Sequence, residues 1–393
     1  MNKKQIIMTS NWFYPATKAG GPINSAGNFV KALSCDYEIF IITDDRDFGE
    51  STPYPGVIVD KFCDYFGAKV FYCSSLLSML KVLINLLRSN PNALLFLNSF
   101  CSIHFSIVPM IMRRLKVFNN KVVVSPRGEF NVNALSIKAN KKRLFLLIAQ
   151  MFGLYKSQNI FFHGSSEYER NDIAKIFKKK QIFIAPDVVL ANQESSNESL
   201  LVKDCGFLRV IFLSRISKMK NLEFAIEVLA SAKGEVVFDI FGPLEDQDYW
   251  KICLERIALL PKNIKVNYCG EVEKDDVRDV MKKYHLFFSP TLGEGFGHAI
   301  YEALTSNCIL LISDRTPWRK LEMEGVGWDI SLDSKVQFVC AINKLISIEK
   351  DEYMNYLAKI SRFLKKINLP EETVSSNRSM IETVFASAGI DDK

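Results

Sequence analysis

A short glycine-rich stretch in the C-terminal half of the chain has residue types and spacing that could bind a diphosphate. Gly293, Gly295 and Gly297 follow an apolar run and lead into an amphipathic segment at residues 298–305. Glycine lets the backbone approach a ligand closely, and the first amides of a helix that begins after such a loop attract an anion. The pattern predicts a strand, an anion-binding loop and a helix.

Two carboxylates accompany these glycines. Glu302 falls in the first turns of the predicted helix and can reach back toward its mouth, where a carboxylate could accept two hydrogen bonds from a vicinal ribose diol. Glu294 lies in the loop and could hold the hydroxyls of a sugar. The alternative is an ordinary strand, turn and helix whose acids lie on the surface. Glycine spacing, acid spacing and position in the fold together favour a binding site.

A second stretch, residues 211–221, combines the end of an apolar run with a basic loop. Arg215 and Lys220 lie five residues apart in this loop, with Lys218 between them. Arginine offers a planar pair of donors and lysine a mobile point charge, the usual pair for a diphosphate. Taken alone, the loop is more typical of a solvated surface. Its position about 80 residues before Glu294 favours a role in phosphate binding.

Short apolar runs alternate with longer amphipathic stretches along the chain, a pattern typical of a parallel sheet covered by helices. Polar residues at 192–197 interrupt the pattern, which then restarts. We expect an α/β protein with two doubly wound, Rossmann-like domains, residues 1–192 and 198–370, and a final helix within residues 371–393 that returns to the first domain. Open parallel sheets bind ligands beyond the carboxyl ends of their strands, so two facing sheets would form a cleft between the domains.

The positions of these elements follow from the same alternation. In the first domain we predict strands at residues 6–8, 38–43, 57–60, 94–97, 121–125 and 160–163, and helices at 24–34, 76–88 and 138–155. In the second we predict strands at residues 209–213, 236–241, 264–268, 286–289 and 308–312, and helices at 222–231, 249–260, 275–283 and 298–305.

These motifs resemble those of a known family. Glu294 and Glu302, separated by seven residues around Gly-Phe-Gly, match the E-x7-E signature of retaining GT-B glycosyltransferases of family 4. The resemblance implies that Glu294 contacts the donor sugar and that Glu302 binds the ribose hydroxyls. It also implies that the backbone of Phe296, Gly297 and His298 binds sugar and phosphate.

The resemblance extends to other parts of the second domain. It implies that Arg215 and Lys220 neutralise the leaving nucleotide diphosphate, and that the glycine turns at Gly242 and Gly270 line the nucleobase. The segment Thr316-Pro-Trp318 resembles a variant common in surface-polysaccharide members of the family. Packed tryptophans explain that segment equally well.

In the N-terminal half the family resemblance is less specific. Gly20 and Gly21 resemble the glycine loop that approaches the donor phosphate and the acceptor. They also imitate a dinucleotide site, because Asp44 ends the second strand, but the G-x-G-x-x-G order is absent. Arg127 stands at about the place where many members have a His that touches the donor sugar. The Arg could hold a phosphate there.

Two further residues of this half are acceptor-site candidates. Glu129 could orient Arg127 or an acceptor hydroxyl, or it could simply be an acid at a helix start. His163 lies in a segment that matches the family's strand–Ser–Glu turn, and it is either an acceptor-site residue or a satisfied core histidine. We expect Ser166 to cap the next helix, with Glu169 at the capping-box position.

Composition and charge limit the class of protein further. No segment approaches the roughly 20 uninterrupted apolar residues of a membrane span. The nine cysteines show no C-x-x-C pair, which suggests free thiols in a reducing, cytoplasmic compartment. Residues 1–192 carry 24 Lys and Arg against 13 Asp and Glu, a net charge of +11, with basic clusters at 138–143 and 175–180. These clusters are either solvated helix faces or a contact with an anionic membrane surface.

Other partners are not expected. The aromatic residues are not interleaved with the basic clusters, so a nucleic-acid surface is not predicted. Asp45 and Asp47 form a D-x-D pattern, which we interpret as part of a solvated loop. Because Arg215 and Lys220 can neutralise the diphosphate, no metal ion or other cofactor is required.

The resemblance implies retaining transfer of a sugar from a UDP- or GDP-sugar to a glycan or lipid-linked acceptor, as in bacterial lipopolysaccharide or capsule synthesis. A second hypothesis is a catalytically silent subunit that binds a nucleotide sugar within a polysaccharide assembly complex. A third is an NAD-dependent oxidoreductase.

Overall fold

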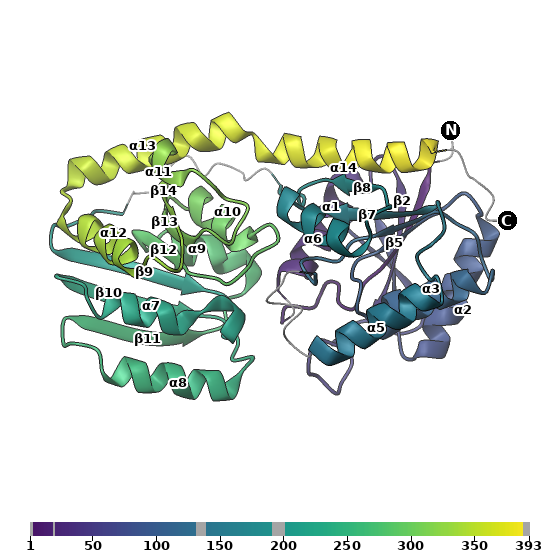
Figure 1. Ribbon diagram of the computed structural model, residues 1–393, viewed down its shortest axis with the longest axis horizontal. Coiled ribbons are helices and arrows are strands. Elements are labelled where there is room, and N and C mark those ends of the chain that lie inside the picture. The colour runs from purple at the N-terminus through teal and green to yellow at the C-terminus, as the bar shows by residue number, and fades with distance from the viewer. Residues whose placement is uncertain (1–2, 19, 131–138, 191–200, 388–393) are drawn as a thin grey trace. The chain divides into compact units, whose positions relative to one another are not determined.

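The computed structural model describes residues 3–18, 20–130, 139–190 and 201–387, and for residues 139–144 the backbone alone. The chain divides into two compact units. Unit 1 comprises Met1–Leu190 with Pro370–Lys393, and unit 2 comprises Ala191–Leu369. Each unit contains its own sheet flanked by helices (Figure 1). The expected linker at residues 192–197 lies outside the described residues.

Within the described residues, unit 1 has an eight-stranded sheet in the order β3-β4-β2-β1-β5-β6-β7-β8, in which the edge pair β3–β4 is antiparallel. Its strands are β1 (Gln5–Thr9), β2 (Glu38–Asp44), β3 (Phe62–Tyr65), β4 (Ala68–Cys73), β5 (Leu94–Leu97), β6 (Val122–Val124), β7 (Ile160–Gly164) and β8 (Ile182–Ile184). Its helices are α1 (Gly21–Leu33), α2 (Leu76–Ser89), η1 (Ile103–Ile107), α3 (Val108–Arg114), α5 (Ala139–Met151), α6 (Glu167–Ile176) and α14 (Leu369–Ala386).

Alternate residues of the central strands of unit 1 pack on opposite faces of the sheet. On β1, Ile6 and Met8 join a core that also contains residues of α1 and α14, whereas Ile7 joins a second core with residues of α2, α3 and α6. The last helix, α14, contributes Met380 and Ile381 to the first of these cores. Unit 1 is therefore built from two segments that are distant in the sequence.

Unit 2 has, in the described part of the chain, a six-stranded parallel sheet in the order β11-β10-β9-β12-β13-β14. Its strands are β9 (Phe207–Leu213), β10 (Glu235–Phe241), β11 (Ile264–Gly270), β12 (Leu286–Ser289), β13 (Ile309–Ser313) and β14 (Gly327–Ile330). Its helices are η2 (Lys218–Lys220), α7 (Leu222–Leu229), α8 (Gln247–Ala258), η3 (Lys274–Asp276), α9 (Val277–Met281), α10 (His298–Thr305), α11 (Leu321–Glu324), α12 (Lys335–Ser347) and α13 (Lys350–Ile367).

The strand order of unit 2 reverses between β9 and β12, which pair at Val210 and Leu286. This is the order of doubly wound dinucleotide-binding sheets, in which ligands bind beyond the carboxyl ends of the strands at the reversal. The predicted fold class, α/β with two doubly wound units, is confirmed. No helix in the described ranges combines the length and the apolar character that crossing a bilayer requires.

One predicted strand is wrong. Residues 57–60 are not in a strand, and the edge strand is instead β3, which pairs with the unpredicted strand β4. The β-branched run at 57–59 ends at Asp60, whose left-handed backbone (φ 57°) is incompatible with an extended strand. The Asp60 carboxylate accepts hydrogen bonds from the hydroxyls of Ser74 and Ser78, which fixes this turn.

Candidate functional site

Loops that follow three strands of unit 2 are joined by backbone hydrogen bonds at the carboxyl edge of the sheet. The amide of Ile216, after β9, donates to the carbonyl of Pro243, after β10 (2.8 Å). The amide of Leu292, after β12, donates to the carbonyl of Met219 (2.8 Å). The basic loop after β9 is therefore held between its neighbours, and its side chains emerge at the position where such sheets bind ligands.

Lys220 and Glu294 form an ion pair across two of these loops. Lys220 Nζ lies 2.6 Å from Glu294 Oε2, and the two side chains are 16% and 24% exposed. Lys220 ends the short helix η2, and Asn221 follows it with a left-handed backbone (φ 58°). The Asn221 side-chain amide donates to the carbonyl of Pro290 (3.0 Å), which ties the lysine to the loop that carries Glu294. Two residues predicted to share a site are thus in contact.

Arg215 is paired with an acid that the sequence analysis did not select. Its guanidinium lies 2.7 Å from Glu245 Oε2, with side chains 39% and 30% exposed. Gly242 makes this arrangement possible, because a Cβ at Gly242 would lie 2.0 Å from the carbonyl oxygen of Ser214. The loop of Arg215 can therefore rest against the turn after β10. The position of Glu245, just beyond the Gly242 turn, is the signal that could have identified it.

The helix α10 begins with an open N-terminus. Gly297 precedes it with φ 85°, and among the described residues no side chain caps it. A Cβ at Gly297 would lie 2.8 Å from Ile300 Cδ1 and 3.2 Å from Glu294 Cγ, so glycine brings the loop close to both. Amides in the first turn of a helix lack intrahelical partners. The mouth of α10, next to the Lys220–Glu294 pair, has the electrostatic character of an anion site.

Glu302 lies one turn into α10, on the same face as His298. Burial raises the pKa of the Glu302 carboxyl, while the charges of His298 and Lys274 act in the opposite direction. Lys274 begins η3, after β11, and burial lowers its pKa whereas the charge of Glu302 raises it. Lys274 was not among the predicted site residues, and its place after the glycine that ends β11 is a weak signal for it.

Trp318 supports the glycine loop from within the protein. Its indole Nε1 donates to the carbonyl of Phe296 (2.7 Å), and the two rings pack edge to face with centroids 5.9 Å apart. The Phe296 ring also lies 5.0 Å from the His298 ring. Trp318 is 8% exposed, so it is a packed core residue that also fixes the backbone before α10. This supports the interpretation of Trp318 as a packed residue, and the likeness of Thr316-Pro-Trp318 to a surface-polysaccharide variant stays a prediction.

In unit 1, Gly20 and Gly21 also lie at an open helix N-terminus. Gly20 precedes α1 with φ 68°, and within the described residues no side chain caps this helix. Pro22 occupies the first turn, where it removes one amide. Ala19, the first residue of the motif, lies outside the described residues. The mouth of α1 is a second place at which backbone amides are available to an anion.

Arg127 belongs to a buried polar network beside that helix. Its Nε donates to Asn98 Oδ1 (2.7 Å), and its guanidinium pairs with Asp187; the two charged side chains are 8% and 9% exposed. The Ser25 hydroxyl lies 2.6 Å from an Asp187 carboxylate oxygen and 3.1 Å from the Gly21 carbonyl oxygen, and its single proton is shared between these two acceptors. A phosphate at Arg127 would have to displace Asp187, so the arginine as placed organises the loops rather than presenting a free charge.

The two acceptor-site candidates have protein partners. Glu129 Oε2 accepts hydrogen bonds from the amides of Phe100 (2.7 Å) and Cys101 (2.9 Å), and so holds the loop after β5. Its expected contact with Arg127 or an acceptor hydroxyl stays a prediction. Ser166 Oγ accepts from the Glu169 amide (3.3 Å), which confirms the predicted cap.

His163 is a satisfied core histidine. It is 1% exposed, its Nε2 donates to the carbonyl of Ala185 (2.7 Å), and its Nδ1 lies 2.9 Å from Ser125 Oγ. Because a carbonyl only accepts, Nε2 carries the proton and the Ser125 hydroxyl donates to Nδ1. Burial, with the charge of Arg127, lowers the pKa of His163 to about 4, so the ring is neutral at pH 7. As placed, neither nitrogen is available to an acceptor.

The D-x-D pattern was predicted to lie in a solvated loop, and this is wrong for Asp45. Asp45 is 2% exposed and pairs with Arg46 (2.7 Å). Asp47 Oδ2 accepts hydrogen bonds from the amides of Thr17 (2.8 Å) and Lys18 (3.2 Å). Both acids are used to fold the loop after β2. The described residues contain no group of three or more His, Cys, Asp or Glu that could hold a metal ion.

Residues 201–362, most of unit 2, match the model of the family described as Glycosyl transferases group 1. A curated relative, the phosphatidylinositol N-acetylglucosaminyltransferase gpi3 subunit of Schizosaccharomyces pombe, is 27% identical to this chain over 138 residues. The matched stretch covers 34% of this chain and 29% of the relative, so the chain spans less than a third of that protein's length.

Solved structures share the fold over nearly the whole chain. HepE of Anabaena, solved with UDP and glucose, has a TM-score of 0.66 at 14% identity, covering 98% of this chain and 100% of that one. WaaG, a glycosyltransferase involved in lipopolysaccharide biosynthesis, has a TM-score of 0.67 at 11% identity, covering 97% and 100%. The fold that these likenesses show is GT-B. Most of unit 2 thus matches the model of the glycosyl transferases group 1 family, in a chain with the GT-B fold.

Proposed function

We propose that the protein is a glycosyltransferase that moves a sugar from a UDP- or GDP-sugar to a glycan or lipid-linked acceptor, with retention of anomeric configuration. Glycosyl transfer from a nucleotide sugar is supported by the family match of unit 2 and by structural neighbours that bind UDP. Retention and the acceptor class rest on the E-x7-E resemblance.

The observation that carries the proposal is the Lys220–Glu294 pair at the open mouth of α10. A diphosphate at this mouth would attract the Lys220 ammonium and compete with Glu294 for it. The freed carboxylate could then accept hydrogen bonds from hydroxyls of the sugar. Departure of the diphosphate builds negative charge, and donors preorganised where charge develops are usually the largest catalytic contribution.

The remaining roles follow from position. We propose that Arg215 binds the diphosphate together with Lys220, and that Glu302 accepts hydrogen bonds from the ribose diol. The backbone of residues 296–298 would bind sugar and phosphate, and Gly242 would line the nucleobase. In unit 1 the α1 mouth at Gly20 and Gly21 would hold a further anion or the acceptor.

Two cations at the site supply the positive charge that a metal ion supplies in other diphosphate sites. We therefore propose that turnover needs no metal, and expect activity to persist in the presence of a chelator. For the pathway we propose bacterial surface-polysaccharide synthesis at the cytoplasmic face of the membrane. The support is the Thr316-Pro-Trp318 motif and the likeness to WaaG, a lipopolysaccharide enzyme.

The test is turnover. Purified protein is incubated with UDP- and GDP-sugars and a lipid-linked acceptor, and released nucleoside diphosphate is quantified together with the lengthened glycan. NMR of the product reports the anomeric configuration. Nucleotide-sugar binding without diphosphate release would favour a catalytically silent subunit of a polysaccharide assembly complex. A melting temperature raised by NADH and not by UDP would favour the oxidoreductase.

A further inference from the structure

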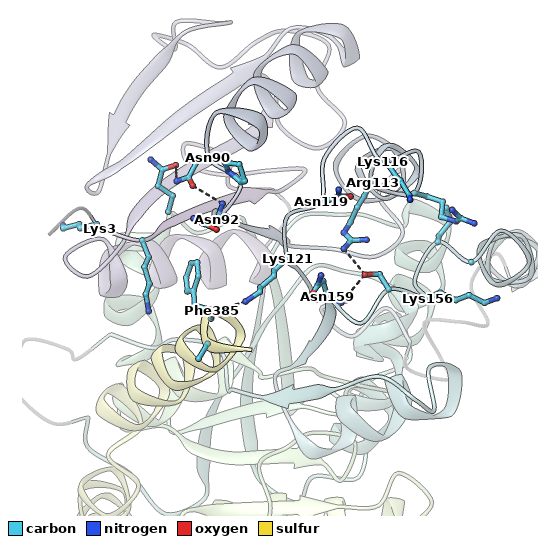
Figure 2. A pocket seen from close by; sticks show the side chains of 18 residues that line it. Lys3, Asn90, Asn92, Arg113, Lys116, Asn119, Lys121, Lys156, Asn159 and Phe385 are labelled. Atoms are coloured by element: carbon cyan, nitrogen blue, oxygen red, sulfur yellow. Dashed lines mark hydrogen bonds between the residues drawn. The ribbon is translucent and has the colours of Figure 1, made fainter. Parts of the chain in front are cut away.

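A cavity opens at the amino edge of the unit 1 sheet, the edge away from Gly20 and Arg127. Its volume is about 950 Å³, near the upper end of the roughly 300–1,000 Å³ of small-molecule sites. It is lined by the segments that precede β1, β5, β6 and β7 and by the ends of α3 and α14 (Figure 2). The proposed function assigns nothing to it.

The lining of this cavity has one sign of charge. Of its eighteen described residues, seven are Lys or Arg and none is Asp or Glu. One of the seven, Lys4, is neutralised from outside the lining by an ion pair with Glu382. Clustered like charges in a recess raise the local concentration of oppositely charged ligands. The cavity is therefore an anion site by composition.

Arg113 is a buried charge in the cavity wall, with 6% of the residue exposed. Its Nε donates to the carbonyl of Asn120 (3.2 Å), and an Nη donates to the hydroxyl of Ser157 (2.9 Å). These two hydrogen bonds fix the orientation of the guanidinium. A guanidinium held in one orientation suits the planar, bidentate recognition of phosphate oxygens.

Lys121 lines the cavity and also binds the C-terminus of α14, which is sufficient to explain a lysine at this position. Its Nζ donates to the carbonyls of Val384 (3.0 Å), Phe385 (2.8 Å) and Ser387 (2.6 Å), at the C-terminus of α14. A cation there is favourable because of the helix dipole. That explanation does not extend to Lys116 and Lys156, whose exposed side chains contribute to the lining from the end of α3 and from the loop before β7.

The positive surface continues beyond the cavity. Lys180, in the second basic cluster of the sequence, donates from Nζ to the carbonyls of Lys156 (3.0 Å) and Ser157. Amide side chains complete the lining: Asn90, which donates to Gln5 (2.8 Å), and Asn159. Fixed cations together with amide donors are the groups that bind phosphate oxygens.

We propose that this cavity binds a ligand whose charge is carried by several phosphate groups. The inference is independent of the proposed function. The cavity lies at the amino edge of the unit 1 sheet, whereas the proposed nucleotide-sugar site lies in unit 2. Two sources share this chemistry, a soluble polyphosphate and the headgroups of an anionic lipid surface. Leu115 and Phe152, next in sequence to the lining residues Arg114 and Gly153, are 71% and 58% exposed. They would contact lipid in the second case.

The first arm is isothermal titration of the full chain with inorganic tripolyphosphate. We expect a binding event, separate from any at the proposed donor site, that the double variant Lys116→Glu, Lys156→Glu weakens at least 10-fold. The control Lys61→Glu makes one lysine-to-glutamate change, half the charge shift of the double variant, at an exposed position on the carboxyl edge of this sheet. It should keep the event, and so should Lys220→Ala, which alters the proposed donor site. Circular dichroism and thermal unfolding of the double variant check its fold. If the double variant binds tripolyphosphate as wild type does, or if Lys220→Ala alone abolishes binding, the proposal is overturned.

The second arm separates the sources by flotation with vesicles of phosphatidylcholine, with and without phosphatidylglycerol. A lipid source predicts flotation with the anionic vesicles alone, competition by tripolyphosphate, and loss in both the double lysine variant and Leu115→Ser, Phe152→Ser. A soluble source predicts tripolyphosphate binding without flotation. Flotation that the lysine variants leave unchanged would contradict a role for this cavity.

Discussion

Lys220 Nζ lies 2.6 Å from Glu294 Oε2, although 74 residues separate them in the sequence. The pair joins the loops after β9 and β12, the two strands at which the order of the unit 2 sheet reverses. Each side chain is partly buried, so the interaction is less screened than a surface ion pair. A diphosphate bound at α10 has to compete with Glu294 for the lysine.

Replacing Lys220 by alanine should lower turnover by about 100- to 1000-fold, the usual cost of one donor to developing charge. The variant should stay folded, because Asn221 still ties the loop to Pro290. Lys218→Ala is the matched control, since Lys218 lies on the same short helix with an exposed side chain. Diphosphate release is the measurement. Equal losses in both variants would point to the loop rather than to the Lys220 ammonium.

Replacing Glu245 by alanine should strengthen UDP binding, because it releases Arg215 from its ion pair. The pair is roughly a third exposed, so its contribution is at most about 1 kcal/mol, or about a 5-fold change in Kd. Calorimetric titration with UDP measures the effect. Weaker binding in this variant would mean that Glu245 itself contacts the ligand, contrary to the assignment of Arg215.

Replacing Trp318 by phenylalanine removes the indole N–H that holds the Phe296 carbonyl. We expect a stability loss of about 1 kcal/mol from the hydrogen bond, together with weaker UDP binding because the loop before α10 loosens. Trp328→Phe is the control, since the Trp328 indole donates instead to Glu322 (3.2 Å). The pair of variants is compared by UDP titration and thermal unfolding. If Trp318→Phe binds UDP with unaltered affinity, the indole of Trp318 does not support the loop before α10 in the way proposed.

Stability should fall between pH 7 and pH 5 because of His163. Its pKa is about 4 in the folded protein against 6.5 for the free side chain, so in this window the unfolded state binds more protons. The contribution of the neutral ring is therefore lost as pH falls from about 6.5 toward 4, by about 2 kcal/mol between pH 7 and pH 5.

Urea unfolding of His163→Gln at the two pH values checks this expectation. The variant should show a smaller decrease in stability than wild type, whereas His104→Gln, at an exposed position, should match wild type. Burial lowers the pKa of His285, in unit 2, to about 4. His285 therefore causes a second loss of stability as pH falls, which remains in the His163→Gln variant. An identical pH dependence in wild type and His163→Gln would refute the buried neutral ring.

The sequence predicted elements well where periodicity and glycine placement agree. The bounds of β12 and α10 match the predicted residues 286–289 and 298–305, because an apolar run, a glycine loop and an amphipathic stretch follow each other without ambiguity. Strand β3 was missed because its alternate residues are exposed at a sheet edge, so it lacks the apolar run of a buried strand.

The sequence did not predict how the charged residues of the candidate site pair with one another. Lys220 and Glu294 were expected to serve one ligand, but their contact depends on two strands becoming neighbours, which local sequence does not encode. Glu245, Lys274 and Asp187 were missed for the same reason, since each gains its charged neighbour only through sheet topology. Arg127 was expected to be open to phosphate, and its burial follows from β5, β6 and α1 meeting at one edge.

Because α14 packs in unit 1, that unit can complete its core only after nearly the whole chain has been synthesised. A ribosome finishes all of unit 2 before it adds Met380, Ile381 and Val384, which fill the core beside Ile6 and Met8. Until then the nascent N-terminal sheet has one apolar face incompletely covered. A fragment that stops at residue 190 would leave the same face open to chaperones or to self-association.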